Sequence, residues 1–353
     1  MDVYSSSLWI KDIENEAKDL TVLNELAGST VLITGSTGLI CSAIVDLLAW
    51  YNRSHDANIN VLAAGRDTEK IKTRFRAFCN EKWFQAVEYD ATSEKNDFSF
   101  ECDYIIHGAS NASPSKIVEQ PVETMLSNFS GTKYLLDYSY AKNVKRFLFI
   151  SSSEVYGNKS TNEPFCEDEY GYIDLLNPRN SYSVGKRAAE TLCASYASEY
   201  NVDYVIVRPG HIYGPTASQT DSRVSSAWAY DVANGIDIIM KSDGSQLRSY
   251  CYCLDCASAI ITVLVKGQSG EAYNISNPNS VISIREMAEI MTQYAGVELR
   301  MELPTAEEKK GFNPMINSSL NSNKLAGLGW FGVFDAKTGF AHTIDILKEC
   351  SKK

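Results

Sequence analysis

Short apolar runs alternate with longer amphipathic segments over the first part of the chain. The apolar runs lie at 31–33, 60–64, 104–106, 146–150 and 205–207. The amphipathic segments, whose apolar residues have helical spacing, lie at 40–51, 123–141 and 183–200. Solidly apolar strands that alternate with helices are typical of a parallel sheet covered on both faces. We therefore predict an α/β fold with a doubly wound parallel sheet, whose ligand lies beyond the carboxyl ends of the strands.

The pattern changes at both ends of this alternation. Residues 8–27 form an acidic amphipathic stretch that predicts one or two helices, packed on the protein itself or on a partner. After about residue 210, turns rich in Gly, Pro and Asn become frequent. We therefore predict a helical extension at 1–27, a large sheet domain at 28–210 and a smaller α+β substrate-binding lobe at 211–353. The last boundary is soft, and we expect the two parts to interleave.

Composition and charge argue against several classes of partner. The chain has 353 residues, of which 44% are hydrophobic and 22% charged, with a formal net charge of −11 and a pI near 5.0. This acidic excess disfavours nucleic acid as a partner, because phosphate backbones attract Lys and Arg. No apolar run approaches the roughly 18 residues of a membrane span, and the first residues lack the pattern of a signal peptide. We expect a cytoplasmic protein with neither a membrane nor a nucleic-acid partner.

Nine cysteines are scattered through apolar segments, which favours reduced, buried thiols over a disulfide framework. Cys251, Cys253 and Cys256 are spaced closely enough to raise the hypothesis of a zinc site. However, no second Cys or His pair at zinc-finger spacing follows them, and residues 249–254 alternate like a strand. We therefore expect no metal.

The first apolar run leads through a glycine-rich turn into a helix, in the sequence Thr34-Gly35-Ser36-Thr37-Gly38-Leu39-Ile40-Cys41. Glycines let the backbone approach a pyrophosphate, and the N–H groups at a helix N-terminus attract its charge. This context predicts that residues 28–210 form a Rossmann-type dinucleotide-binding domain. The residues expected to contact the cofactor here are Gly35, Ser36, Thr37, Gly38, Leu39 and Ile40. Cys41 stands where a third glycine would allow close helix packing.

The end of the second apolar run, Ala64-Gly65-Arg66-Asp67, carries the residues that would select the cofactor. An acidic residue there binds the ribose hydroxyls of NAD, whereas a basic residue accommodates the additional phosphate of NADP. Arg66 and Asp67 are both candidates. The sequence therefore predicts NAD or NADP without choosing between them.

Tyr182 and Lys186 are the main candidates for catalysis. They lie four residues apart on a predicted helix, so they face the same way. A nearby ammonium favours phenolate over phenol, so we expect Lys186 to lower the pKa of Tyr182 from its usual value of about 10. Such a tyrosine would take a proton from a sugar hydroxyl while the same carbon is oxidised. The spacing is common on solvated helix faces, so its meaning depends on the rest of the sequence.

With these motifs, the sequence resembles the extended short-chain dehydrogenase/reductase family, in which NAD-dependent epimerases and dehydratases modify nucleotide-diphosphate sugars. The resemblance runs from about residue 29 to 345. On the cofactor side it rests on Tyr89-Asp90-Ala91, His107-Gly108-Ala109-Ser110 and Asn128. It implies a cofactor that stays tightly bound and is recycled. The residues implied to line its site are Asp90, Ala91, His107, Ala109, Ser110, Asn128 and Lys186.

On the substrate side, the resemblance rests on Ser151-Ser152-Ser153-Glu154-Val155-Tyr156-Gly157, on Arg208-Pro209-Gly210-His211-Ile212-Tyr213-Gly214-Pro215 and on Gln246-Leu247-Arg248-Ser249-Tyr250. It implies that Ser152 and Tyr182 bind the same sugar hydroxyl. It also implies that Ser113 and His211 contact the substrate and that Arg248 holds its diphosphate. His211 stands where the family usually has an asparagine, which signals an unusual nucleotide or sugar.

The resemblance further implies a bound 4-keto sugar that can lose carbon dioxide, lose water or be re-reduced, with Ser153 and Glu154 deciding the outcome. The dehydratases of dTDP-glucose typically have Thr-Asp-Glu here, and the aspartate protonates the departing hydroxyl. Ser153 lacks that acid, and Asn111-Ala112-Ser113-Pro114 is in the style of UDP-glucuronate decarboxylases. Decarboxylation of UDP-glucuronate is therefore the leading prediction. A 4,6-dehydration of GDP-mannose or dTDP-glucose comes second, because Ser-Glu also occurs in GDP-mannose dehydratases, and 4-epimerisation comes third.

Two further observations concern the alternatives. The decarboxylases usually have an acidic residue and a glycine between the tyrosine and the lysine, and only Gly185 agrees here. Some relatives keep the dinucleotide fold as redox-sensing binding modules, but these usually lose the tyrosine or the lysine. Because both are present, with Ser152 and Glu154, we expect an enzyme that forms a homodimer.

Overall fold

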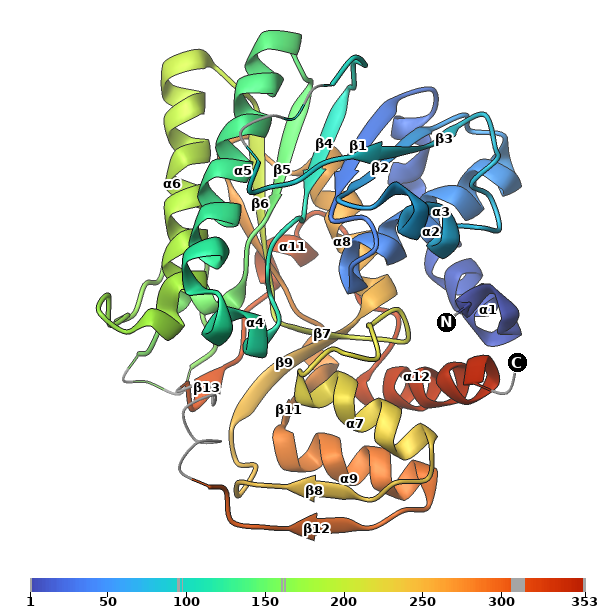
Figure 1. Cartoon of the computed structure of the whole chain (residues 1–353), viewed down its shortest axis with the longest axis vertical. Helices are drawn as coiled ribbons and strands as arrows, with labels where there is room; N and C mark the ends of the chain where they lie inside the picture. The colour runs from blue at the N-terminus through green and yellow to red at the C-terminus, as the bar shows by residue number, and fades with distance from the viewer. Residues whose placement is uncertain are drawn as a thin grey trace.

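The computed structural model describes residues 2–93, 96, 98–159, 161, 163–305 and 315–351. Among these residues the largest element is a seven-stranded parallel sheet in the order β10-β6-β5-β4-β1-β2-β3 (Figure 1). Its strands are β1 Thr30–Thr34, β2 Asn60–Gly65, β3 Phe84–Glu88, β4 Tyr104–His107, β5 Arg146–Ile150, β6 Tyr204–Pro209 and β10 Ala272–Ile275. The predicted doubly wound fold is confirmed. The strand order reverses between β1 and β4, which is where such sheets bind ligands.

Helices cover both faces of this sheet, because successive residues of β1 are buried although they point to opposite faces. Val31 and Ile33 point to one apolar core, and Leu32 points to the other. The first core is covered by α2 Leu39–His55, α3 Thr68–Arg74 and α8 Cys253–Lys266. The second is covered by α5 Pro121–Lys142 and α6 Ser181–Tyr200, which pack along each other. The 3-10 turns η3 Ser153–Tyr156 and η4 Pro178–Asn180 connect β5 to α6.

Two strands of the sheet were not predicted. β3 contains the exposed polar residues Gln85 and Glu88 between and after its buried ones, so it lacks a solid apolar run. β10 comes from the C-terminal part of the chain and pairs in parallel with β6, with α8 packed beside it. The large sheet thus takes in residues well beyond 210, although the domain boundaries themselves stay a prediction.

A smaller lobe lies below the sheet (Figure 1). Its strands are β7 His211–Tyr213, β8 Ile238–Met240, β9 Leu247–Tyr252, β11 Val281–Ser283, β12 Leu299–Met301 and β13 Asn317–Ser318. Its helical segments are α7 Val224–Ala233, η5 Pro278–Ser280, α9 Ile284–Ala295 and α12 Ala336–Ser351. β9 is central, because β7, β11 and β13 all pair with it. Two short helices pack on the sheet domain instead, α4 Pro114–Glu119 against α5 and η4, and α11 Asn323–Ala326 against β10.

The N-terminal residues form η1 Val3–Ser5, α1 Ser7–Ala17 and η2 Thr21–Leu26. Trp9 and Leu23 are fully buried in the first core. α1 packs against α2, α8 and α12, so its apolar stripe is covered by the same chain. In the part of the chain that the structure describes, no helix is long and apolar enough to cross a membrane. The cytoplasmic location stays a prediction.

Candidate active site

The glycine turn after β1 has the shape that a dinucleotide requires. Gly35 has a φ of +68°, and a Cβ there would lie 2.9 Å from the Gly108 carbonyl oxygen, so only glycine fits. Gly38 is the N-cap residue of α2 and has no side chain to cap the helix, which leaves the first N–H groups available to an anion. The Ser36 hydroxyl is buried without a partner among the described residues. These features fit the predicted contacts of residues 35–40 with a pyrophosphate.

The acidic side chain at the end of β2, Asp67, is already hydrogen-bonded to the next helix. Asp67 is the N-cap residue of α3, and its Oδ1 accepts a hydrogen bond of 2.9 Å from the Lys70 N–H. Arg66 is exposed. The Asp90 carboxylate accepts hydrogen bonds from the Thr92 backbone and hydroxyl, while Ala91 packs against Gly131 of α5. The contacts of these residues with a cofactor stay predictions.

The loop after β4 is tied to β1 and α5. The His107 Nδ1 lies 2.8 Å from the Thr34 hydroxyl, whose oxygen also accepts from the N–H groups of Gly108 and Ala109. The Ser110 hydroxyl donates to Asn128 Oδ1 at 2.9 Å. Burial, and then Lys186, lower the pKa of His107 to about 3, so its imidazole is neutral. The structure therefore gathers β1, β4 and α5 at the switch point, as the resemblance implies.

Tyr182 and Lys186 lie on the first turns of α6, and both are buried. The Lys186 Nζ is 5.8 Å from the centre of the Tyr182 ring and donates a 2.7 Å hydrogen bond to the Ile150 carbonyl. Burial, and then Glu154, raise the pKa of Tyr182 to about 12. Burial lowers the pKa of Lys186 to about 7. The expected lowering of the tyrosine pKa is therefore wrong for the protein alone, because burial and the Glu154 carboxylate raise the pKa more than Ser152, Arg223 and Arg179 lower it.

The end of β5 brings three of the predicted catalytic residues to the same place. A hydrogen bond with Ser152 partly offsets the raised pKa of Tyr182. Ser153 is buried, and Glu154 lies within η3. The Glu154 carboxylate accepts from both Nη atoms of Arg179, at 3.2 and 3.3 Å, and from the Ser183 hydroxyl at 3.2 Å. The carboxylate is thus held as a hydrogen-bond acceptor beside Tyr182.

The predicted substrate residues of the smaller lobe face this cluster. His211 and Tyr250 pair across β7 and β9, and the Nδ1 of His211 is buried without a partner among the described residues. Burial, then Arg248 and Arg223, lower the pKa of His211 to about 3. The Nη atoms of Arg248 donate to backbone carbonyls, including that of Met315 at 2.8 Å. These contacts do not test the prediction that Arg248 holds the diphosphate of the substrate.

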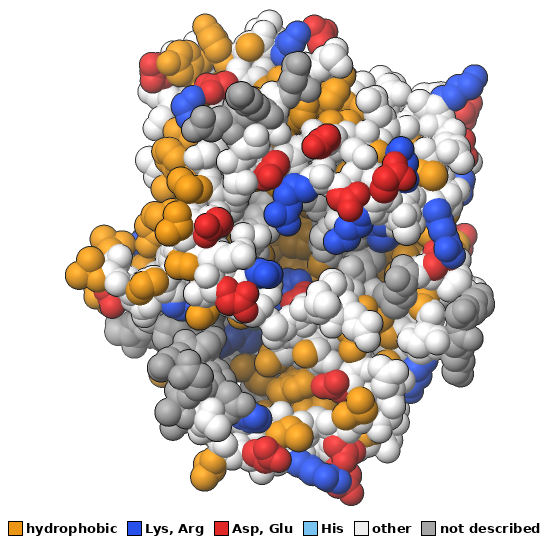
Figure 2. Space-filling model, viewed as in Figure 1, with side chains coloured by type: hydrophobic (Ala, Val, Ile, Leu, Met, Phe, Trp, Pro, Cys, Tyr) orange, Lys and Arg blue, Asp and Glu red, His pale blue; other side chains and the backbone are white. Residues whose placement is uncertain are grey.

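Ser113 connects the two parts of the molecule. Its hydroxyl lies 3.1 Å from that of Ser222, which precedes α7 in the smaller lobe, and 3.1 Å from that of Ser115. The loop after β4 thereby reaches across to the substrate lobe. Figure 2 shows a hollow at the centre of this face with Lys and Arg side chains around it.

Sequence reasoning missed three charged residues of this region. Arg179 holds Glu154. Arg223 lies near enough to lower the pKa of both Tyr182 and His211. Glu190, one helical turn after Lys186, binds Arg208 and the Ser151 hydroxyl. Only Glu190 had a local signal, since Tyr182, Lys186 and Glu190 recur every fourth residue. The other two depend on loops that only the fold brings together.

The three cysteines considered for a metal lie on β9 and α8, and all are buried. Burial raises the pKa of Cys253 and Cys256 well above the usual range. In the described ranges, no group of three or more His, Cys, Asp or Glu side chains is placed to hold a metal ion.

Known proteins share this architecture over most of the chain. A model of the NAD dependent epimerase/dehydratase family matches residues 31–276. UDP-glucuronic acid decarboxylase 3 from Arabidopsis thaliana is 30% identical over 303 residues, which are 85% of this chain and 83% of that protein. The dTDP-D-glucose 4,6-dehydratase of Homo sapiens is 27% identical over 332 residues, or 90% of each protein. An epimerase from Methanothermobacter thermautotrophicus has a similar fold, with a TM-score of 0.79, 21% identity and coverage of 94% and 96% of the two chains.

These matches confirm the family resemblance seen in the sequence. The matched region begins at β1 and includes the glycine turn, the end of β5, the Tyr182–Lys186 helix and β9. The family is described as NAD dependent, which agrees with the predicted dinucleotide cofactor, while the roles of Arg66 and Asp67 stay predictions. The chain therefore belongs to the NAD dependent epimerase/dehydratase family of enzymes.

Proposed function

We propose that this enzyme oxidises C4 of a nucleotide-diphosphate sugar and acts on the transient 4-keto sugar, with decarboxylation of UDP-glucuronate as the leading reaction. The observation that carries the proposal is the convergence of Tyr182, Lys186 and Ser152 with Glu154 at the carboxyl ends of β1, β4 and β5. That convergence also speaks against a purely redox-sensing module, which needs no buried tyrosine beside a strand-end hydroxyl.

The chain's own residues would manage protons at the sugar hydroxyl. Tyr182, as phenolate, accepts the proton of the hydroxyl, and Ser152 orients the same oxygen. The Lys186 ammonium stabilises the phenolate before it takes that proton. Bound NAD would supply the electron acceptor and the positive charge of its nicotinamide ring. The residues that would hold it are those of the glycine turn, with His107, Ser110 and Asn128 behind them.

Two features of the Glu154 region support loss of carbon dioxide. Loss of water needs an acid that donates a proton to the departing hydroxyl, whereas the Ser153 hydroxyl is a far weaker acid than a carboxyl group and Glu154 accepts three hydrogen bonds. A glucuronate carboxylate needs a cation nearby, and the guanidiniums of Arg179 and Arg223 lie close enough to lower the pKa of Tyr182, although each is also paired, with Glu154 and Asp221 respectively. The similarity to a UDP-glucuronic acid decarboxylase points the same way.

Dehydration remains the second candidate because Glu154 is retained beside Tyr182. A carboxylate there is placed to take the C5 proton of a 4-keto hexose, and the human relative is a dTDP-D-glucose 4,6-dehydratase. Epimerisation is third, since it requires neither residue 153 nor residue 154.

A panel of substrates tests the proposal. Purified protein with NAD is incubated separately with UDP-glucuronate, dTDP-glucose, GDP-mannose and UDP-glucose. The products are separated by chromatography, and their masses are measured by mass spectrometry. We expect UDP-glucuronate to lose the mass of carbon dioxide. Loss of the mass of water from one of the hexoses would support the dehydratase instead. A product of unchanged mass that chromatography separates from its substrate would support the epimerase, and substrates unchanged in both mass and retention would refute the nucleotide-sugar proposal.

We also propose a homodimer formed through α5 and α6. Large apolar side chains stay exposed along these two helices, namely Val122, Met125, Leu126, Phe129, Tyr140 and Tyr200. Light scattering should give about twice the chain mass of 39.2 kDa. Leu126→Lys should halve that mass, while Leu303→Lys, at an exposed position of the smaller lobe, should not change it. A wild-type mass of one chain would contradict the dimer.

A further inference from the structure

Three residues of α6 bind three consecutive residues at the end of β5. Tyr182 is hydrogen-bonded to Ser152, and the Lys186 ammonium donates to the Ile150 carbonyl. One turn further along the helix, the Glu190 carboxylate accepts a hydrogen bond of 2.5 Å from the Ser151 hydroxyl. Residues at i, i+4 and i+8 share one face of a helix, so the three contacts form a row. Glu190 is the member of this row that the proposed chemistry does not use.

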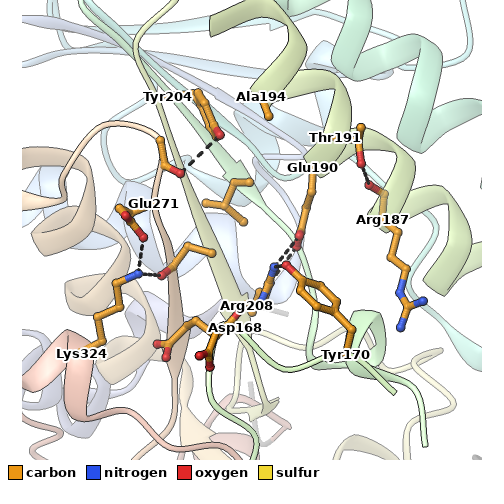
Figure 3. A pocket seen from close by; sticks show the side chains of 14 residues that line it. Asp168, Tyr170, Arg187, Glu190, Thr191, Ala194, Tyr204, Arg208, Glu271 and Lys324 are labelled. Atoms are coloured by element: carbon orange, nitrogen blue, oxygen red, sulfur yellow. Dashed lines mark hydrogen bonds and ion pairs between the residues drawn. The ribbon is translucent and has the colours of Figure 1, made fainter. Parts of the chain in front are cut away.

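Arg208 clamps Glu190 from the neighbouring strand. Its Nε donates to Glu190 Oε1 at 3.0 Å, and its Nη2 donates to Oε2 at 2.7 Å. Figure 3 shows the Arg208 guanidinium between Glu190 and Tyr170. The Tyr156 and Tyr170 hydroxyls accept from the remaining N–H groups, each at 3.0 Å. Arg208 is only 2% exposed, so this two-point ion pair is shielded from water although it borders a cavity of about 620 Å³.

The clamp is also tied to the strand that carries the catalytic serine. Arg208 follows Val207 on β6, and Val207 is the register partner of Ile150 on β5. The Ser151 N–H donates to the Val207 carbonyl at 2.8 Å. Ser151 is therefore held at its backbone by β6 and at its hydroxyl by Glu190. A shift of Glu190 would therefore move Ser151. Its two neighbours are Ile150, which accepts from Lys186, and Ser152, which is hydrogen-bonded to Tyr182.

Glu190 is also the main carboxylate acting on Lys186. Burial lowers the pKa of Lys186 to about 7, and Glu190 is the largest influence in the opposite direction. The other titratable or charged groups that face Lys186 and Glu190 come from α2, β4, β6, α6 and η3. They are Cys41, His107, Arg208, Tyr204, Tyr182, Arg187, Cys193 and Tyr156. The neutral His107 and the protonated Cys41 contribute no negative charge beside the lysine.

We propose that Glu190, fixed by Arg208, is a positioning residue that keeps the Lys186 ammonium charged and holds the end of β5 under Tyr182. It touches neither substrate nor cofactor and acts through Lys186 and Ser151. The effect on turnover rests on the function proposed above, whereas the effect on the charge of Lys186 does not.

The charge of Lys186 can be measured without any substrate. In protein labelled with [13Cε]lysine, the Lys186 resonance is assigned by its disappearance in Lys186→Met and titrated by NMR. We expect Glu190→Gln to lower the measured pKa of Lys186 by about one unit. Glu199→Gln, which removes an exposed carboxylate from the last turn of the same helix, should leave it unchanged. Because Glu190→Gln leaves Arg208 buried without its partner, the paired variant Glu190→Gln/Arg208→Met is titrated as well.

The kinetic readout separates positioning from folding. With the substrate identified by the panel, the alkaline limb of kcat/KM should move to lower pH by the same amount as the lysine pKa, giving about a tenfold loss at pH 8. A lower melting temperature alone would not move that limb. An unchanged Lys186 pKa in both Glu190 variants overturns the proposal. A shifted pKa in a protein that transforms no nucleotide sugar would uphold the role of Glu190 and refute the proposed function.

Discussion

Two buried polar regions of this protein handle charge in opposite ways. At the α6–β5 junction, each carboxylate faces a guanidinium, with Glu190 on Arg208 and Glu154 on Arg179. At the α1–α8 junction, Glu16 and Asp255 face each other, and Asp255 accepts from backbone N–H groups rather than from a cation. Burial raises the pKa of Glu16 well above its usual value and that of Asp255 to about 6.

The difference follows from what each region does. A carboxylate paired with arginine has a permanently positive partner, because arginine keeps its proton over the whole physiological range. A pair of buried carboxyl groups instead retains a proton to avoid repulsion. We therefore expect the two ion pairs of the α6–β5 junction to position the catalytic groups, and the α1–α8 junction to make the stability of the N-terminal helix depend on pH.

Loss of the tyrosine hydroxyl should have the largest effect. Tyr182→Phe keeps the buried ring but removes the proton acceptor, so kcat should fall by about 10² to 10⁴-fold. Tyr294→Phe, at an exposed position of α9, is the matched control and should keep full activity. Steady-state assays with the substrate from the panel measure both. A Tyr182→Phe enzyme with more than a tenth of wild-type kcat would contradict the role given to this residue.

Breaking the Glu154–Arg179 pair should have the next largest effect. Arg179→Met removes the guanidinium that donates to both carboxylate oxygens, so we expect kcat to fall about 10²-fold with the fold retained. Lys72→Met breaks an exposed pair with Glu69 on α3 and should change kcat less than twofold. Equal activities of the two variants would show that the buried pair is structural only.

Breaking the Glu190–Arg208 pair should mainly affect stability. Arg208→Met leaves a buried carboxylate without its partner, which costs about 3 to 5 kcal/mol in the free energy of unfolding. The double variant Glu190→Gln/Arg208→Met removes both charges and should recover most of that loss. Urea unfolding measures all three proteins. If the double variant is as unstable as the single one, packing rather than charge pairing explains the effect.

Glu16→Gln, at the α1–α8 junction, should give the smallest effect, and it should stabilise the protein rather than destabilise it. The folded pKa of Asp255 is raised to about 6 from 3.8, so the folded state binds more protons between these values. Its contribution to stability is therefore fully present below pH 3.8 and is lost as the pH rises through 6. Glu16→Gln should stabilise the protein at pH 7.5 by about 1 kcal/mol and flatten this dependence.

Thermal unfolding between pH 5 and pH 7.5 checks the stability of this junction. Glu14→Gln changes an exposed carboxylate of the same helix and is the control, because it should follow the wild-type curve. A Glu16→Gln protein less stable than wild type at pH 7.5 would show that the carboxylate, not its proton, is needed there.

The prediction of the fold succeeded wherever a local pattern was sufficient. β1 and β5 were found from solid apolar runs, and α6 from its helical period. β10 was missed because a short strand from the far end of the chain is recognisable only by its pairing with β6. The helices near the N-terminus were expected, but their packing on α2, α8 and α12 depends on segments far away in sequence.

In the active site, too, some features follow from local sequence and others from the tertiary structure. The sequence by itself determined the glycine turn, the Tyr182–Lys186 spacing and the family, because these need only neighbouring residues on one turn or one helix. Only the tertiary structure decided how those residues ionise, since burial raises the pKa of Tyr182 and lowers that of Lys186. It also brought Arg179 to Glu154 and Arg208 to Glu190. Electrostatic interactions act through space and depend on burial, so no spacing along the chain could reveal them.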